Sequence, residues 1–195
     1  MGEGGALAFN NDEMLEKAEI LREKGTDRSK FFRGQVDKYR WQDFGSSYLP
    51  SELNAAYLYA QLEVSDKICA KRQQIWEYYN TNLAPLKEKG FIEQPFVPEG
   101  CTNNYHMYYL KVKDIKVRSK LIAWLKEHGA ASVFHYVPLH SAPAGIKFGR
   151  FHGEDVYTTK ESERLMRLPM FYNLDMEYVA KVTELLLSYP DYEEI

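Results

Sequence analysis

One short apolar segment near the amino terminus constrains the fold of this chain more than any other feature. Residues 5–9 read Gly-Ala-Leu-Ala-Phe, which predicts a strand, and the glycines before them predict a turn. No second strand is predicted before residue 105, and a single strand buries too little surface to be stable. We therefore expect either that a partner chain completes this sheet or that the chain is the back half of a larger protein.

Composition excludes several classes of protein. The 195 residues are 45% hydrophobic and 27% charged, which is typical of a globular domain and excludes general disorder. A net charge of −3 argues against nucleic acid and against an anionic membrane surface as partners. No apolar run is long enough to span a membrane, and residues 1–5 lack the pattern of a secretory signal. With only two cysteines, reduced thiols and a cytoplasmic location are expected.

The first third of the chain predicts two helices separated by a long loop. Asp12–Lys24 has helical apolar spacing and a stop at Gly25, and Ser51 caps a second helix that runs to residue 62. That second helix is apolar nearly all round, so we expect it to be buried on more than one side. A long amphipathic helix then starts at Ser65 and extends to about Leu83.

The remainder of the chain alternates between strand and helix patterns. A strand is expected over residues 105–113, with Tyr108, Leu110 and Val112 on one face. The later elements predicted are a helix over 117–128, a strand over 132–136, a helix over 159–166 and a helix that Asp175 caps and that ends at Ser188. We expect the fold class to be α/β, with an α+β arrangement in this part of the chain.

Residues 26–50 lack any sustained period and combine basic with aromatic side chains. Arginine matches phosphate oxygens and aromatic rings stack on bases, so one interpretation is a binding loop that clamps a ligand with phosphate groups and a base. The alternative is a solvated loop with a few buried aromatics. The residues concerned are Arg28, Phe31, Phe32, Arg33, Lys38, Tyr39, Arg40 and Trp41.

Two histidines five residues apart, His135 and His140, raise the question of a metal site. Zinc needs a third ligand at a suitable spacing, and the other histidines and cysteines are scattered, so we predict no metal. The plain alternative is an ordinary strand end whose histidine is satisfied by the backbone.

Three stretches together resemble the C-terminal half of a DegT/StrS-family sugar aminotransferase that depends on pyridoxal phosphate. They are the Gly-Glu-Gly-Gly turn at residues 2–5, the pattern Tyr39-x5-Gly45-x-Ser47 with the helix after it, and residues 135–140 followed by Glu161-Ser162-Glu163 and Leu168-Pro169-Met170. The sequence of residues 20–63 is most similar to the subgroup of dTDP-4-amino-4,6-dideoxygalactose transaminases of bacterial surface-polysaccharide synthesis.

The resemblance implies a fold and an organisation. The chain is expected to be the C-terminal part of a fold-type I transferase, with residues 1–62 as a remnant of the large cofactor-binding domain and its sheet. Residues 63–195 are expected to be the small domain. The loop 26–50 is expected to reach the site of a neighbouring subunit in a homodimer.

The resemblance also implies the ligands. Pyridoxal 5′-phosphate is the cofactor of the complete enzyme, and Ser47 stands where many relatives have an asparagine that reaches its phosphate. Leu49 replaces an arginine, which leaves this phosphate contact open. The substrates implied are glutamate and a nucleotide sugar, with these contact residues: Arg33, Lys38, Tyr39, Ser46, Tyr48, His135, Tyr136 and His140.

The family's Schiff-base lysine is expected before Met1, so this chain alone is predicted to lack a catalytic residue and transaminase activity. Lys24 and Lys38 do not stand at the family position, and an exposed lysine is mostly protonated. The complete enzyme is expected to move an amino group from glutamate to C4 of a dTDP-4-keto-6-deoxyhexose. The alternative is a non-catalytic module that binds nucleotide sugar or dimerises.

Overall fold

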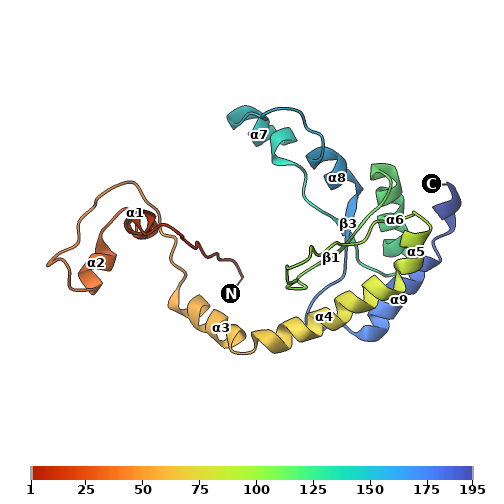
Figure 1. Ribbon diagram of the computed structural model, residues 1–195, viewed down its shortest axis with the longest axis horizontal. Helices are drawn as coiled ribbons and strands as arrows, with labels where there is room; N and C mark the ends of the chain where they lie inside the picture. Colours follow the sequence, from red (N-terminus) through yellow and green to blue (C-terminus); the bar gives the residue numbers. More distant parts are fainter. Residues whose placement is uncertain (1, 195) are drawn as a thin grey trace. The chain divides into compact units, whose positions relative to one another are not determined.

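The computed structural model describes residues 2–194, with side chains described as far as Tyr192. The chain forms two compact units, which divide between Ser65 and Asp66 (Figure 1). No helix formed by residues 2–194 combines the length and the apolar character that a bilayer crossing requires.

The second unit is a small antiparallel sheet with helices packed beside it. The strands β1 (Tyr108–Lys111), β2 (Val133–Phe134) and β3 (Leu165–Leu168) lie in the order β1-β3-β2, with both neighbours of β3 antiparallel to it. Tyr109 and Val133 flank Arg167 across the sheet. The other elements are α4 (Ser65–Asn82), α5 (Ala84–Glu88), α6 (Ile115–Glu127), η1 (Leu139–Ser141), α7 (Pro143–Phe148), α8 (Thr158–Arg164), α9 (Met176–Leu187) and η2 (Pro190–Glu194).

Alternate residues of the two central strands build the core of this unit. Tyr108 and Leu110 of β1 and Met166 of β3 are fully buried, so the face that Tyr108 and Leu110 were predicted to share is the one that points into the core. Figure 1 shows α6, α9 and α5 gathered beside β1 and β3. The buried apolar side chains of α4, α6 and α9 are Ile75, Trp76, Tyr79, Val117, Leu121, Leu125, Val179, Val182 and Leu186.

Caps fix the starts of the two amphipathic helices α6 and α9. The Asp114 carboxylate accepts hydrogen bonds from the backbone N–H groups of Lys116 (2.8 Å) and Val117 (3.0 Å). Asp175 accepts from the N–H of Glu177 at 3.0 Å, as the sequence predicted.

The strand predictions in this unit were only partly right. The strands expected over 105–113 and 132–136 are shorter, and the helix expected over 159–166 ends at Arg164. Residues 165–168 instead form β3, the central strand, which the sequence analysis missed. Leu-Met-Arg-Leu continues the apolar spacing of α8 without a breaker, so only pairing with β1 and β2 decides its conformation.

The first unit contains three helices and no strand within residues 2–65. Its helices are α1 (Glu13–Arg22), α2 (Arg28–Phe32) and α3 (Glu52–Leu62). The strand predicted for residues 5–9 is wrong, because no neighbouring strand in the described chain bonds to it. Part of the expected loop is helical, since α2 lies within residues 26–50.

The helix predicted to follow Ser51 begins where expected, but its apolar side chains are exposed rather than buried. The Ser51 hydroxyl accepts from the N–H of Asn54 at 3.3 Å, which confirms the cap of α3. Leu53 is 84% exposed and Tyr57, Tyr59 and Leu62 are exposed as well, so the expected burial on several sides is wrong for this chain. Among the described residues of the first unit, only Glu23 and Gly25 are buried.

Two glycines allow the end of α1 and the returning loop to cross. Gly25 has a left-handed backbone (φ 75°), and a Cβ on it would lie 1.7 Å from the carbonyl oxygen of Asp43. A Cβ on Gly45 would lie 2.1 Å from the nitrogen of Gly25. The backbones therefore touch at a point where no side chain fits.

Core packing in the second unit predicts a sharp contrast between two leucines. Leu121→Ala removes a side chain with no exposed surface and should lower the free energy of unfolding by roughly 2–5 kcal/mol. Leu53→Ala, the same change at a helical position that is 84% exposed, should cost within about 0.5 kcal/mol. Urea unfolding of both variants checks this, and equal losses would contradict the assigned core.

The glycine crossing predicts a local effect of Gly45→Ala. The added Cβ must push the loop away and break the bonds from Lys24 N–H to the Ser46 carbonyl (3.1 Å) and from Ser46 N–H to the Leu21 carbonyl (2.9 Å). Amide hydrogen exchange at Lys24 and Ser46 should become about tenfold faster or more. Gly5→Ala is the control, since its Cβ meets nothing within 4 Å; unchanged exchange in Gly45→Ala would refute the crossing.

Candidate functional site

In the first unit, backbone hydrogen bonds fix the segment Ser46–Tyr48 against the end of α1. The N–H of Ser46 donates to the carbonyl of Leu21 (2.9 Å), and the N–H of Tyr48 donates to the carbonyl of Arg22 (3.2 Å). Ser46 and Ser47 are exposed. None of the hydrogen bonds formed by side chains of the described residues involves either hydroxyl. Tyr48 is exposed too. These predicted ligand contacts thus present free hydroxyls on a fixed backbone.

The predicted clamp residues of the loop have different surroundings. Both terminal nitrogens of Arg33 donate to the Glu19 carboxylate of α1, at 2.8 and 2.7 Å, so this guanidinium already holds an anion. Tyr39 packs edge-on against Phe31 with 5.9 Å between ring centroids. Lys38 is exposed, and none of the described carboxylates pairs with it.

Arg28, rather than Arg33, is the cation that contacts the aromatic side chains of this loop. Its guanidinium carbon lies 5.0 Å from the Phe32 ring centroid and 5.9 Å from that of Tyr39. It also lies near the buried Glu23, with 3.6 Å between nitrogen and carboxylate oxygen. The structure therefore brings together Arg28, Phe31, Phe32 and Tyr39.

In the second unit, His140 belongs to a polar cluster with α8. Its Nε2 lies 2.8 Å from the Asp155 carboxylate and 3.4 Å from the Thr159 hydroxyl, and that hydroxyl also donates to Asp155. Hydrogen bonds from Thr159, with a smaller effect of His140, hold the pKa of Asp155 below its ordinary value. Asp155 had no signal in the sequence, because fifteen residues separate it from His140.

His135 and Tyr136 lie beside an arginine that the sequence analysis missed. The Arg167 guanidinium carbon is 5.8 Å from the Tyr136 ring centroid. Burial, with smaller effects of Arg167 and His106, lowers the pKa of His135. An arginine inside the apolar run Leu-Met-Arg-Leu was the one available signal for Arg167.

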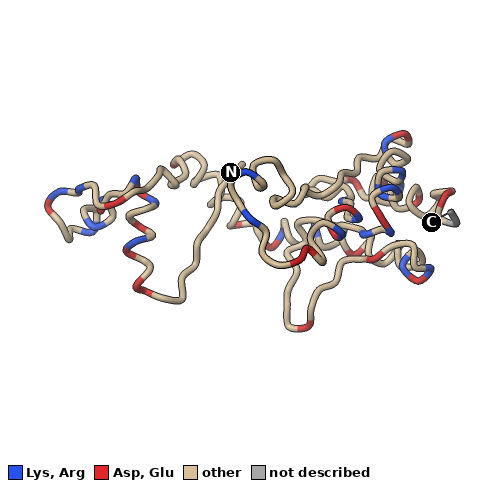
Figure 2. Tube along the Cα trace, turned by 90° about the horizontal axis from the view of Figure 1, so that it is seen from above, with Lys and Arg blue, Asp and Glu red and all other residues tan. Residues whose placement is uncertain are grey.

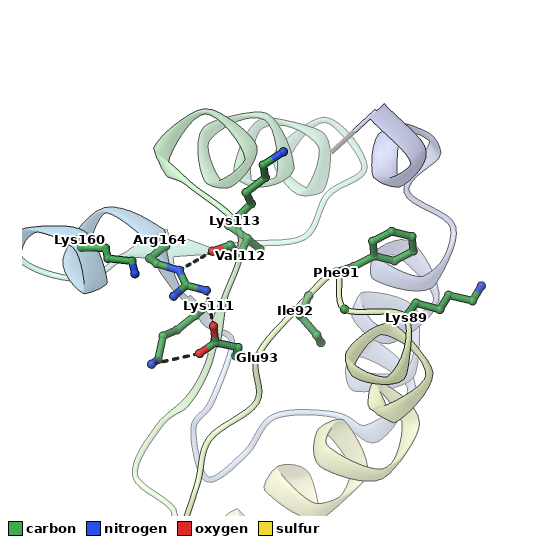
Figure 3. Close-up of a pocket in the computed structure, with 10 residues that line it drawn as sticks. Lys89, Phe91, Ile92, Glu93, Lys111, Val112, Lys113, Lys160 and Arg164 are labelled. Atoms are coloured by element: carbon green, nitrogen blue, oxygen red, sulfur yellow. Dashed lines mark hydrogen bonds and ion pairs between the residues drawn. The ribbon is translucent and has the colours of Figure 1, made fainter. Parts of the chain in front are cut away.

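The larger hollow of the second unit has a basic lining and contains none of the predicted site residues. Its volume is about 490 Å³, and Figure 3 shows Glu93 between Lys111 and Arg164. Lys111 also binds Glu161 at 2.7 Å. Carboxylates thus neutralise Lys111 and Arg164. Along the whole trace, acidic and basic residues are interspersed (Figure 2). The lining residues are Lys89, Gly90, Phe91, Ile92, Glu93, Lys111, Val112, Lys113, Lys160 and Arg164.

The Arg33–Glu19 pair predicts how the loop responds to acid. The hydrogen bond from Arg33 holds the pKa of Glu19 below its ordinary value of 4.5, so the pair stabilises the folded loop above that pH. This contribution should be lost as pH falls through the lowered value.

Arg33→Gln should therefore bring the pKa of Glu19 up toward 4.5, as measured by carboxyl ¹³C NMR titration. Lys38→Gln is the matched control, because Lys38 is no partner of Glu19. A Glu19 pKa that is the same in the Arg33→Gln variant as in the unchanged protein would contradict the pairing.

Comparison with known proteins gives consistent matches. The chain is 27% identical over 191 residues to the spore coat polysaccharide biosynthesis protein SpsC of Bacillus subtilis (94% of this chain and 48% of that protein covered). It is 25% identical to the dTDP-3-amino-3,6-dideoxy-alpha-D-galactopyranose transaminase of Aneurinibacillus thermoaerophilus (95% and 47% covered). The chain thus spans about half the length of these curated relatives.

Solved structures show the same fold. The crystal structure of NtdA from Bacillus subtilis, with the cofactor PMP bound, superposes with a TM-score of 0.74 at 23% identity, over 92% of this chain and 40% of that one. The chain thus has part of a fold-type I fold, as predicted. The model of the DegT/DnrJ/EryC1/StrS aminotransferase family matches residues 1–187, and the chain belongs to that family.

Proposed function

We propose that this chain is part of a pyridoxal-phosphate sugar aminotransferase that moves an amino group from glutamate to C4 of a dTDP-4-keto-6-deoxyhexose. The family match over residues 1–187 is the observation that carries the proposal. The transaminase of Aneurinibacillus thermoaerophilus, a relative over 95% of this chain, is named for a dTDP-linked amino sugar and supports this class of substrate.

The serines of the first unit fit the phosphate of the cofactor. Free hydroxyls on a backbone fixed by hydrogen bonds can donate to a phosphate without first breaking another bond. Ser47 would hold the phosphate, with Ser46 and Tyr48 beside it for the substrate. Pyridoxal phosphate supplies the electron sink that amino transfer requires.

The remaining residues bind and orient the sugar nucleotide. Lys38 offers an unpaired charge and Tyr39 a ring that Arg28 and Phe31 hold in place. Arg33 can bind a diphosphate only by exchanging the Glu19 carboxylate for it. In the second unit, Tyr136 is exposed and His140 is oriented by Asp155, so both can donate or accept hydrogen bonds at the sugar.

The proposal includes an assembly and a place of action. The loop 26–50 would serve the neighbouring site of a homodimer in the cytoplasm. The Schiff-base lysine would come from sequence that precedes the Gly-Glu-Gly-Gly turn, since no lysine of this chain stands at the family position. The chain alone would then bind ligands without turning them over.

The first test joins the chain to its expected other half. DNA upstream of the Met1 codon should continue the reading frame and encode a lysine shortly before Gly2. The joined protein should aminate a dTDP-linked 4-keto-6-deoxyhexose faster than the UDP-linked one, and borohydride should trap pyridoxal phosphate on that lysine. The 195-residue chain alone should give no stoichiometric adduct at any single lysine.

Two results would contradict the proposal. A unique pyridoxyl-lysine on the 195-residue chain would show that the lysine is not missing, and equal rates with both nucleotides would refute the dTDP preference. The alternative, a non-catalytic binding module, would be supported if no such reading frame exists while the chain binds dTDP.

Ser47→Ala in the joined protein tests the cofactor contact. Loss of a hydrogen bond to a charged phosphate should weaken pyridoxal phosphate binding roughly tenfold or more. Ser51→Ala is the matched control, because its hydroxyl caps α3 and its loss should leave cofactor affinity unchanged. Equal affinities of the two variants for the cofactor would exclude Ser47 as a phosphate ligand.

A further inference from the structure

Arg167 lies in the centre of the sheet, on the side away from the core. Its strand neighbours Met166 and Leu168 are buried, so alternation turns Arg167 to the open face, between Tyr109 of β1 and Val133 of β2. The Ser132 hydroxyl donates to the Arg167 carbonyl at 2.7 Å. The backbone beneath this arginine is therefore held on both sides.

The guanidinium of Arg167 has no carboxylate partner among the described residues. Its Nη2 donates only a long bond (3.4 Å) to the Phe134 carbonyl, and its buried Nε has no partner. Arg33 and Arg164, by contrast, each bind a carboxylate, the latter in the larger hollow (Figure 3). A half-buried guanidinium without a counter-charge is poorly compensated, so an anion that reaches it is bound strongly.

One histidine, His135, lies close to Arg167, and a second, His106, lies close to His135. His135 keeps its Nδ1 buried without a partner, which leaves Nε2 as the nitrogen that a ligand can reach. Burial, with smaller effects of Arg167 and His106, lowers the pKa of His135, which disfavours a second positive charge beside Arg167. Nδ1 of His106 is 2.7 Å from the Asn104 side-chain oxygen, which orients that ring.

A second hollow reaches β1, the strand beside Arg167, although neither Arg167 nor His135 lines it. It has a volume of about 220 Å³, and its lining includes His106 and Tyr109, the cross-strand neighbour of Arg167. Apolar side chains such as Trp76, Phe96 and Met107 form much of the remaining wall. A polar group bound there is partly shielded from water, which strengthens its interaction with a nearby charge.

We propose that Arg167 anchors an oxyanion-binding subsite, with His135 and His106 as neighbouring ligands, that takes a carboxylate or phosphate group of a substrate. This inference rests on the proposed function, which supplies two such groups: the carboxylates of the amino donor and the diphosphate of the sugar nucleotide. Arg167 fits either, because its planar fork can donate two parallel hydrogen bonds to one oxyanion.

The test is a ligand titration of the ¹⁵N-labelled 195-residue chain, without cofactor. Glutarate represents the donor carboxylates, and inorganic pyrophosphate represents the diphosphate. One of the two should shift the Arg167 Nε–H resonance saturably and raise the pKa of His135, because a bound anion stabilises the protonated ring.

Arg167→Gln should weaken the binding roughly tenfold or more, and Arg167→Lys, which keeps the charge and loses the fork, should lie between. Arg150→Gln is the control, since Arg150 is exposed and lies outside the sheet. Circular dichroism of each variant shows whether the fold is retained.

The outcomes show whether the bound group comes from the amino donor or from the nucleotide. They also distinguish a failure of this inference from a failure of the proposed function. Arg167-dependent binding of glutarate assigns the subsite to the amino donor, and Arg167-dependent binding of pyrophosphate assigns it to the nucleotide. Binding of neither, or binding that Arg167→Gln leaves unchanged, overturns the inference. Because no cofactor is used, the subsite can be confirmed even if the joined protein transfers no amino group, and it can fail while transfer is observed.

Discussion

The alternation of side chains along β1 and β3 determines most of what the second unit can do. Tyr108, Leu110 and Met166 are buried under the helices, and this burial is the main source of stability of the unit. A slip of one residue in either strand would exchange the two faces of that strand. The same packing therefore fixes Tyr109 and Arg167 on the open face.

The first unit is held together by different forces. No hydrophobic side chain among its described residues is buried, so backbone hydrogen bonds, the Gly25–Gly45 crossing and the Arg33–Glu19 pair hold the loop. Such interactions fix direction well and contribute little free energy each. The conformation of the segment Ser46–Tyr48 is thus fixed by local hydrogen bonds and not by packing against a hydrophobic core.

Sequence reasoning succeeded where the signal is local. The caps Ser51 and Asp175 and the alternation in β1 were predicted from neighbouring residues. It failed where long-range pairing decides: residues 5–9 have no strand to bond, and β3 exists only through β1 and β2. The partners of Arg33 and His140, fourteen and fifteen residues away, were equally invisible before the chain was folded.

The cationic side chains of the two units differ in whether a carboxylate neutralises them. Arg33 and Arg164 are neutralised by carboxylates, so an incoming anion must displace an existing partner before it binds them. Lys38 has no such partner but is exposed, where water screens its charge. Arg167 alone among these four is half-buried and lacks a carboxylate, and it lies close to His135, which follows β2. Its attraction for an oxyanion is therefore opposed neither by a competing carboxylate nor by full solvation.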